Sequence, residues 1–269
     1  MGKTDCNHEQ KLIDKVFTDS SIFWKETYQG KDAHGLNVRQ RQIAALSYVD
    51  ELSLPKTARI LEIGCGAGFM SVALAQRGFT VEAVDHAPVM IELTKRNAQQ
   101  AGMSNKIRAS IEDVHQLKFE DESFDLIVSL GVLQWLHNLR KALKEIVRVL
   151  KPGGYIVLNI PRSHAFFNPL SVPAFEIILE KAKRKVLRSA LHYKRDVVLP
   201  HTYMPKEFNQ YLSAENLTII KSTTVGFGVI KILNREVFSK IQQRLQHFSG
   251  SSNPILRAVG SQYVVLAKK

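Results

Sequence analysis

The chain has 269 residues, of which 45% are hydrophobic and 23% charged, and its formal net charge is +12. Because it contains no run of ~18 uncharged apolar residues and starts with a polar segment, we expect neither a transmembrane helix nor a secretory leader. Its two cysteines, Cys6 and Cys65, exclude a disulfide framework and a cysteine metal site, which favours a soluble protein of the reducing cytoplasm.

Residues 1–50 are predicted to form a helical N-terminal cap. An aromatic group that includes Trp24 and Tyr28 precedes an apolar, helix-forming run from Gln42 to Val49. Tyr28 is a candidate lid residue over a ligand, and packing against Trp24 is the alternative interpretation. Residues 51–269 are predicted to form the main domain.

Residues 59–69 place a strand, a carboxylate and three glycines directly before a helix. The strand spans residues 59–63 and contains Glu62, and the helix is predicted to begin at Phe69. Glycines at such a turn let the backbone approach a ligand closely. A dinucleotide-binding turn would need a glycine at position 69, where this chain has phenylalanine. A ligand-free glycine turn is the alternative. The favoured prediction is a nucleoside pocket that includes Gly64, Cys65, Gly66 and Gly68.

A second carboxylate follows the next predicted strand. Residues 79–84 are predicted to form a short buried strand that ends in Asp85, 21 residues after Gly64. This separation is close to the ~20-residue offset of a ribose-binding acid in a βαβ unit. Asp85 is therefore predicted to bind ribose hydroxyls, with His86 beside it at the site, whereas an N-cap of the following helix is the alternative.

Three further strands are predicted between residues 107 and 160. The third starts at residue 107 and leads into a turn with Glu112, Asp113 and Val114; the fourth spans residues 123–131 and includes Leu130. A helix is predicted to open at 132–136. Residues 151–154, Lys-Pro-Gly-Gly, are predicted to form a tight turn before the fifth strand at 155–160. This alternation predicts an α/β fold with a doubly wound, mostly parallel sheet.

A basic insertion follows the fifth strand, at about residues 162–203. Residues 160–269 hold 17 Lys and Arg against 6 Asp and Glu, whereas residues 1–159 hold 20 against 19. Apolar residues recur at helical spacing among these cations, which fits either peripheral contact with an anionic membrane or a lid helix with solvated charges. Nucleic-acid binding is not expected, because the basic run lacks interleaved aromatic residues.

The last part of the chain is predicted to return to the sheet. We expect a helix at 204–212 with Pro205 in its first turn, a strand at 217–225, an inserted helix at 235–248 and a final strand at 262–267.

From Glu62 to Ile160, the chain resembles class I S-adenosylmethionine (SAM)-dependent methyltransferases of the type-11-like group, which includes enzymes of ubiquinone and menaquinone synthesis. The resemblance implies a Rossmann-like, seven-stranded sheet whose last strand enters antiparallel between two others. It also implies that SAM is the cofactor. The residues that it places at SAM are Glu62, the glycine loop with Cys65, Asp85, an acid at 112 or 113, the backbone of Val114, and Leu130 at the methionine end.

The resemblance implies methyl transfer to an oxygen or carbon atom of a small-molecule or lipid-like acceptor. Such a reaction needs a general base, for which histidine has a suitable pKa. The candidates are His137 after the fourth strand, His164 in the insertion, and His201 with Tyr203 before the next helix.

Residues 129–132, Ser-Leu-Gly-Val, differ from the Asn-Pro-Pro-Tyr with which amino-group methylases hold a planar nitrogen. No cluster of metal ligands is recognised in the sequence, so no metal site is predicted. Two other functions stay open: an RNA or protein methyltransferase guided by the basic region, and a SAM-binding protein of this fold that transfers no methyl group. The oligomeric state is not indicated.

Overall fold

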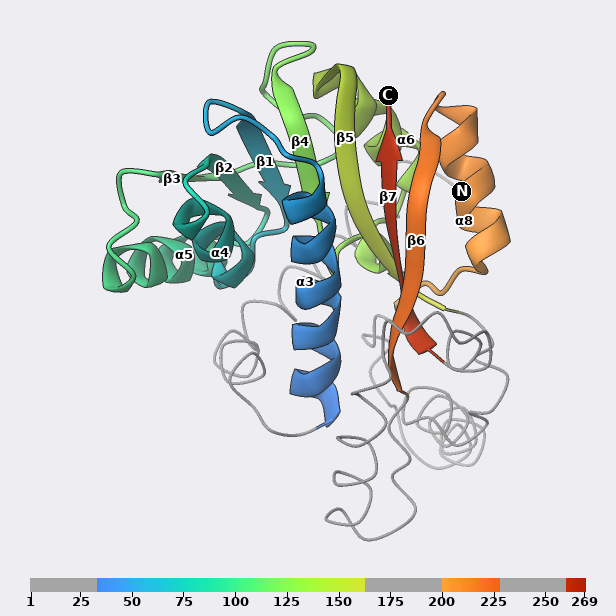
Figure 1. The fold of residues 1–269 in the computed structure, drawn as a ribbon, viewed down its shortest axis with the longest axis horizontal. Coiled ribbons are helices and arrows are strands. Elements are labelled where there is room, and N and C mark those ends of the chain that lie inside the picture. The colour runs from blue at the N-terminus through green and yellow to red at the C-terminus, as the bar shows by residue number, and fades with distance from the viewer. Residues whose placement is uncertain (1–32, 163–199, 228–259) are drawn as a thin grey trace, which may run out of the picture.

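A computed structural model describes residues 33–162, 200–227 and 260–269. In it, a seven-stranded sheet lies between two layers of helices (Figure 1). The strand order is β3-β2-β1-β4-β5-β7-β6, and β7 is antiparallel to both of its neighbours. The predicted doubly wound fold with an antiparallel last strand between two others is confirmed.

The helices and strands alternate along most of the chain. The strands are β1 (Arg59–Ile63), β2 (Thr80–Asp85), β3 (Ile107–Ile111), β4 (Phe124–Ser129), β5 (Leu150–Pro161), β6 (Thr218–Phe227) and β7 (Gly260–Lys268). The helices are α3 (Ala33–Glu51), α4 (Phe69–Gln76), α5 (Pro88–Gln100), the 3-10 helix η1 (Leu133–Trp135), α6 (Leu139–Val149) and α8 (Pro205–Ala214).

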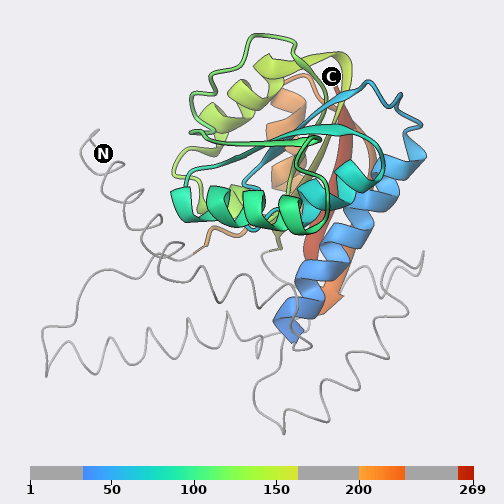
Figure 2. The ribbon, with the colours of Figure 1, turned by 90° about the vertical axis from the view of Figure 1, so that its left-hand side faces the viewer.

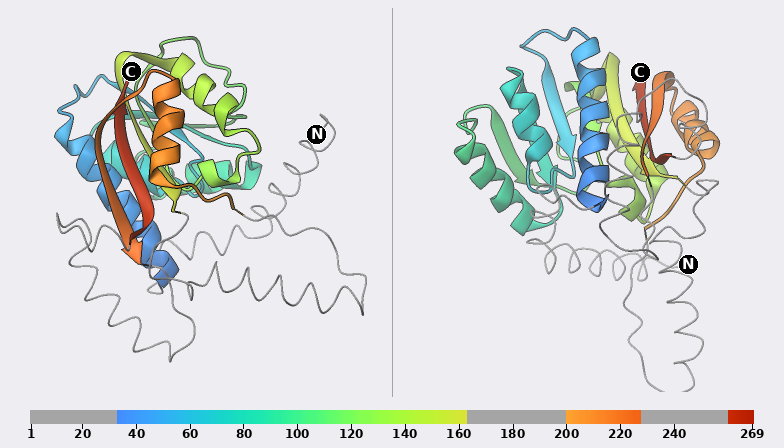
Figure 3. Two further views of the ribbon diagram at one scale, coloured as in Figure 1. Left: turned by 90° about the vertical axis from the view of Figure 1, so that its right-hand side faces the viewer. Right: turned by 60° about the horizontal axis from the view of Figure 1, so that its bottom comes forward.

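Each face of the sheet has its own hydrophobic core. Ala45 of α3, Leu74 of α4 and Ile91 of α5 belong to one buried cluster, whereas Ile146 of α6 and Phe208 of α8 belong to the other. Figure 2 shows α3 and α6 on opposite sides of the sheet, and Figure 3 shows α8 beside β6 and α3 beside α4 and α5. Within the described ranges, no helix combines the length and apolarity needed to cross a bilayer.

The segment after β4 differs from the prediction. Residues 132–136 do not open the next helix; they contain the single turn η1, and α6 begins at Leu139. The Lys141 backbone N–H donates to Oδ1 of Asn138 at 3.0 Å, so Asn138 is the N-cap of α6. The chain therefore turns away from the sheet edge before the helix starts.

The Lys-Pro-Gly-Gly segment also differs from the prediction, because it lies inside β5. The β4–β5 ladder pairs Phe124 with Leu150 and then Leu126 with Tyr155. Residues 151–154 thus bulge out of the ladder, with Gly153 at φ 75°. The strand resumes at Tyr155, near the predicted start of the fifth strand.

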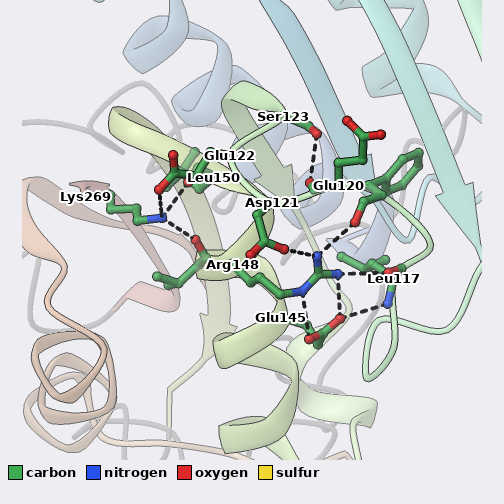
Figure 4. A network of polar contacts seen from close by, with 11 residues as sticks. Leu117, Glu120, Asp121, Glu122, Ser123, Glu145, Arg148, Leu150 and Lys269 are labelled. Atoms are coloured by element: carbon green, nitrogen blue, oxygen red, sulfur yellow. Dashed lines mark hydrogen bonds and ion pairs between the residues drawn. The ribbon is translucent and has the colours of Figure 1, made fainter.

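Arg148 on α6 holds the loop between β3 and β4 (Figure 4). Its guanidinium donates to Glu145 and Asp121 and to the carbonyl groups of Leu117 and Phe119, at distances between 2.6 and 3.0 Å. The Leu117 N–H in turn donates to Glu145 at 3.1 Å. One side chain thereby fixes the loop that begins with the predicted adenine-binding turn.

Some predicted features lie outside the described residues. These are the aromatic group with Tyr28, most of the basic insertion including His164, and the inserted helix at 235–248. The described part of the predicted cap is α3, whose buried residues Ala45 and Tyr48 share a core with strands of the sheet.

Candidate functional site

The three glycines between β1 and α4 all have positive φ, 71° at Gly64, 54° at Gly66 and 78° at Gly68. A Cβ atom at Gly64 would lie 2.0 Å from the Val132 side chain, and one at Gly68 would lie 2.8 Å from Thr94. A Cβ at Gly66 would meet nothing within 4 Å. Packing therefore requires glycine at the outer two positions, whereas Gly66 borders open space that a ligand can enter.

Helix α5 supports the glycine loop from behind. The Thr94 hydroxyl donates to the Gly66 carbonyl at 2.9 Å, and the Asn97 amide donates to the Ala67 carbonyl at 2.7 Å. The Cys65 thiol is buried and lies 3.3 Å from the Thr94 hydroxyl, and burial raises its pKa well above the usual value. Cys65 thus contributes a buried neutral side chain to the loop, and its backbone forms part of the turn.

Asp85, at the end of β2, lies against the same loop. Its Oδ2 accepts the Gly66 N–H at 2.9 Å and its Oδ1 accepts the Ala87 N–H at 3.0 Å. Ala87 is the N-cap of α5, so the alternative that Asp85 caps this helix is wrong. Burial raises the pKa of Asp85 although these N–H groups and the nearby His86 oppose the shift. Each carboxylate oxygen retains a lone pair, so the group can still accept hydroxyl donors.

Glu62 is a buried carboxyl group beneath the glycine loop, 4% exposed. The Ser71 hydroxyl on α4 donates to its Oε2. Burial, and to a lesser extent the negative charge of Asp85, raise the pKa of Glu62 to about 8, against the effect of Ser71. The group is therefore mostly protonated at neutral pH.

The turn after β3 contains two acids in different surroundings. Glu112 Oε2 is buried with no hydrogen-bond partner among the described residues. Asp113 Oδ1 accepts two hydrogen bonds from His115, one from its backbone N–H at 2.9 Å and one from ring Nδ1 at 2.8 Å. The side chain of Asp113 is 48% exposed and that of Val114 is buried. This turn thus offers an exposed carboxylate next to a buried apolar side chain.

His115 has no counterpart among the predicted site residues. It is 3% exposed, and its ring lies 3.9 Å from the ring of His137, centroid to centroid. The structure thereby joins the turn after β3 to the loop after β4. The Asp113 carboxylate forms an Asx turn with the backbone N–H of His115, but any residue except proline supplies that donor, and the contact with His137 is tertiary, so the sequence carried no specific signal for His115.

The end of β4 is held by a buried amide network. The Gly131 N–H donates to Asn159 Oδ1 at 2.6 Å, and Asn159 Nδ2 donates to Gln262 Oε1 at 2.7 Å. Asn159 is fully buried, and the preceding Leu130 is 9% exposed. These contacts connect β4, β5 and β7 at one edge of the sheet, where sequence reasoning placed only Leu130.

Arg41 brings a cation from α3 to this edge. Gly131 has φ 80°, and a Cβ atom there would lie 2.6 Å from the Arg41 guanidinium nitrogens. Arg41 forms no ion pair with any described acid. Nothing in the local sequence distinguishes it from other arginines, so it was not predicted.

The three described candidates for a base lie around the loop after β4. The backbone N–H of His201 donates to the Gln134 carbonyl at 2.8 Å, and the His201 side chain is exposed. Tyr203 packs against Phe208, and burial raises its pKa to about 12. His137 packs on His115. In the described residues, no group of three or more His, Cys, Asp or Glu is placed to hold a metal ion.

Residues 61–158 match the family model described as "Methyltransferase domain". The chain is 28% identical over 196 residues to a ubiquinone biosynthesis O-methyltransferase of Xanthomonas axonopodis pv. citri (strain 306), covering 72% of this chain and 77% of that protein. It is 32% identical over 157 residues to the sterol 4-C-methyltransferase strm-1 of Caenorhabditis elegans, covering 58% and 46%. Magnesium protoporphyrin IX methyltransferase (ChlM) of Synechocystis PCC 6803, solved with bound SAH, shares the fold with a TM-score of 0.67 at 14% identity, covering 97% and 99%.

Proposed function

We propose that this chain, which belongs to the class I SAM-dependent methyltransferases, transfers a methyl group to an oxygen or carbon atom of a small, lipid-like acceptor. The observation that carries the acceptor class is the similarity to the ubiquinone biosynthesis O-methyltransferase. It covers 196 residues and so extends beyond the segment 61–158 that matches the methyltransferase domain. The sterol 4-C-methyltransferase relative supports keeping carbon beside oxygen as the methylated atom.

The described residues fit SAM along the whole edge of the sheet. The space at Gly66 leaves room for the ribose, and Asp85 would accept its hydroxyl groups. Asp113 and Val114 would hold the adenine, and the Arg41 guanidinium would pair with the carboxylate of the methionine part. SAM supplies an electrophilic methyl group on a positively charged sulfur. The residues of the chain position it and exclude water.

The end of β4 supports an acceptor other than a planar amine. Leu130 and Leu133 are buried there, and the Ser129 hydroxyl donates a hydrogen bond to the Ile63 carbonyl at 3.1 Å. The Gly131 N–H is used by Asn159. The segment therefore lacks the Asn-Pro-Pro-Tyr sequence with which amino-group methylases hold their nitrogen, and its one side-chain hydroxyl already donates to the backbone.

His201 is our choice for the general base. Its ring is hydrogen-bonded to none of the described residues, and its backbone is fixed to the loop after β4 through Gln134. Tyr203, with a pKa of about 12, stays protonated at neutral pH and serves as a hydrogen-bond donor. His137 is less suited, because its ring packs on His115.

The test is the formation of S-adenosylhomocysteine (SAH) by the purified protein with phenolic, polyprenylated and sterol-like acceptors. We expect turnover with one of these classes and a mass gain of ~14 Da on the acceptor. His201→Gln should lower kcat about a hundredfold with little change in SAH affinity, whereas Asp85→Ala should abolish SAH binding. Methylation of peptide, RNA or amines alone would overturn the acceptor class, and bound SAM without turnover of any acceptor would favour a protein that transfers no methyl group.

A further inference from the structure

We propose that His115 is a positioning residue for adenine recognition: it holds the Asp113 carboxylate by one oxygen, so that the other oxygen is directed to the exocyclic amino group of SAM. This inference rests on the SAM site described above and on Asp113 as its adenine-binding acid. It concerns how the chain recognises its cofactor and is independent of the methyl acceptor.

The hydrogen bonds of Asp113 support this assignment. Both donors of His115 go to Oδ1, the backbone N–H at 2.9 Å and ring Nδ1 at 2.8 Å. A carboxylate can only accept, so the ring proton must be on Nδ1. Oδ1 is then saturated, whereas Oδ2 accepts from none of the described residues. A carboxylate fixed by one oxygen has a defined direction for the bond that the other oxygen can make.

The surroundings of the ring favour its neutral form. His115 Nε2 is buried and has no hydrogen-bond partner in the described part of the chain. The charged or titratable groups that face it are Asp113 on the same turn, His137 on the loop after β4 and Lys141 on α6, while His86 faces Asp113 from the end of β2. Burial is the main reason that the pKa of His115 lies below its usual value, and His137 and Lys141 add to the effect.

The exposure of the two partners differs in the way that the role requires. The side chain of His115 is 3% exposed and that of Asp113 is 48% exposed. The imidazole is therefore held inside the protein, and the carboxylate that it binds lies at the surface. Arg148 holds Leu117 and the rest of the loop, which keeps the turn in place from its other end.

The test compares two variants with two ligands. His115→Asn keeps a donor near the position of Nδ1, whereas His115→Gln moves the donor toward the position of Nε2. Calorimetry at pH 7.5 would measure the binding of SAH and of S-inosylhomocysteine, in which a carbonyl replaces the amino group. We expect His115→Gln to weaken SAH binding about tenfold and His115→Asn less than about threefold, with neither variant changing S-inosylhomocysteine binding appreciably.

A merely structural role would give a different pattern. Equal losses for both ligands in His115→Gln, or no loss for SAH, would overturn the proposal, as would unchanged SAH affinity in Asp113→Asn. If His115→Gln does not fold, the nitrogen chemical shifts of the wild-type ring decide: a proton on Nδ1 supports the proposal, and a proton on Nε2 alone refutes it. Failure of all acceptors to be methylated would remove the proposed function but leave this binding pattern intact.

Discussion

The buried carboxyl of Glu62 makes the stability of the protein depend on pH in a direction opposite to that of most carboxylates. Its pKa rises from 4.5 to about 8 on folding, mainly because of burial. A raised carboxyl pKa means that the folded state binds the proton more tightly than the unfolded state. Its contribution is therefore fully present below pH 4.5 and is lost as the pH rises through 8.

The size of this loss follows from the two pKa values. Each pH unit between them changes the free energy of unfolding by about 1.4 kcal/mol. At pH 7, ionisation in the unfolded state has therefore removed roughly 3 kcal/mol of the stability that the protonated carboxyl has at low pH. Glu62→Gln replaces the protonated carboxyl with an amide of nearly the same shape, which can still accept the Ser71 hydroxyl and does not titrate.

Urea unfolding of both proteins at pH 5, 6, 7 and 8 would measure the effect. We expect the free energy of unfolding of Glu62→Gln, relative to wild type, to increase by about 3 kcal/mol from pH 5 to pH 8. Any constant cost of the amide shifts this difference equally at every pH. In Ser71→Ala the free energy of unfolding should continue to fall at pH values where that of wild type has levelled off, because removal of the hydroxyl raises the pKa of Glu62 further. Parallel curves for wild type and Glu62→Gln would refute the reasoning.

Three further predictions concern the methionine end of the site and the loop after β3. Arg41→Gln should weaken SAH binding about tenfold by calorimetry, with the exposed α5 variant Arg96→Gln as the unaffected control. Gly131→Ala should lower the free energy of urea unfolding by about 1–2 kcal/mol because of the positive φ at this position. It should also weaken SAH binding, and less so in the Arg41→Gln background than in wild type, because the added Cβ would displace the Arg41 guanidinium. Arg148→Met should cost about 2 kcal/mol in thermal or urea unfolding, whereas Lys144→Met on the exposed side of α6 should stay within about 0.5 kcal/mol; a smaller loss for Arg148 than for Lys144 would contradict its role in holding the loop.

Local signals in the sequence were sufficient for most strands and helices, whereas the antiparallel last strand was implied only by the family resemblance. The strand before Gly64 lies where predicted and the helix after Gly68 begins at the predicted Phe69, since apolar runs and glycines mark them directly. The helix predicted at 132–136 is wrong for a local reason as well, because Asn138 is a better N-cap than any residue between Val132 and His137. The bulge at Gly153 depends on pairing with β4, which sequence alone does not give.

The residues of the site also fall into those that local sequence signals predict and those that only tertiary contacts place. Asp85 was predictable because its offset from the glycine loop is a property of the chain, and the structure places it in contact with that loop. Arg41, His115 and Asn159 were not predictable, because each acquires its place from a contact with a distant segment. A buried histidine or asparagine has no characteristic spacing, and only its partners show what it holds.

Helix α3 shows why such contacts matter for function. Its successive residues Gln40, Arg41 and Gln42 point in different directions around the helix and meet three separate segments. Gln40 accepts the N–H of Gly226 in β6 at 2.9 Å, Arg41 lies against the end of β4, and Gln42 donates to the carbonyl of the first residue of α4 at 3.2 Å. A shift of α3 would therefore disturb three places at once: the start of α4 beside the glycine loop, the proposed methionine end of the SAM site, and β6. The predicted domain boundary at residue 50 therefore divides the sequence but not the site, because α3 contacts the same loops and strands that the main domain contributes to the site.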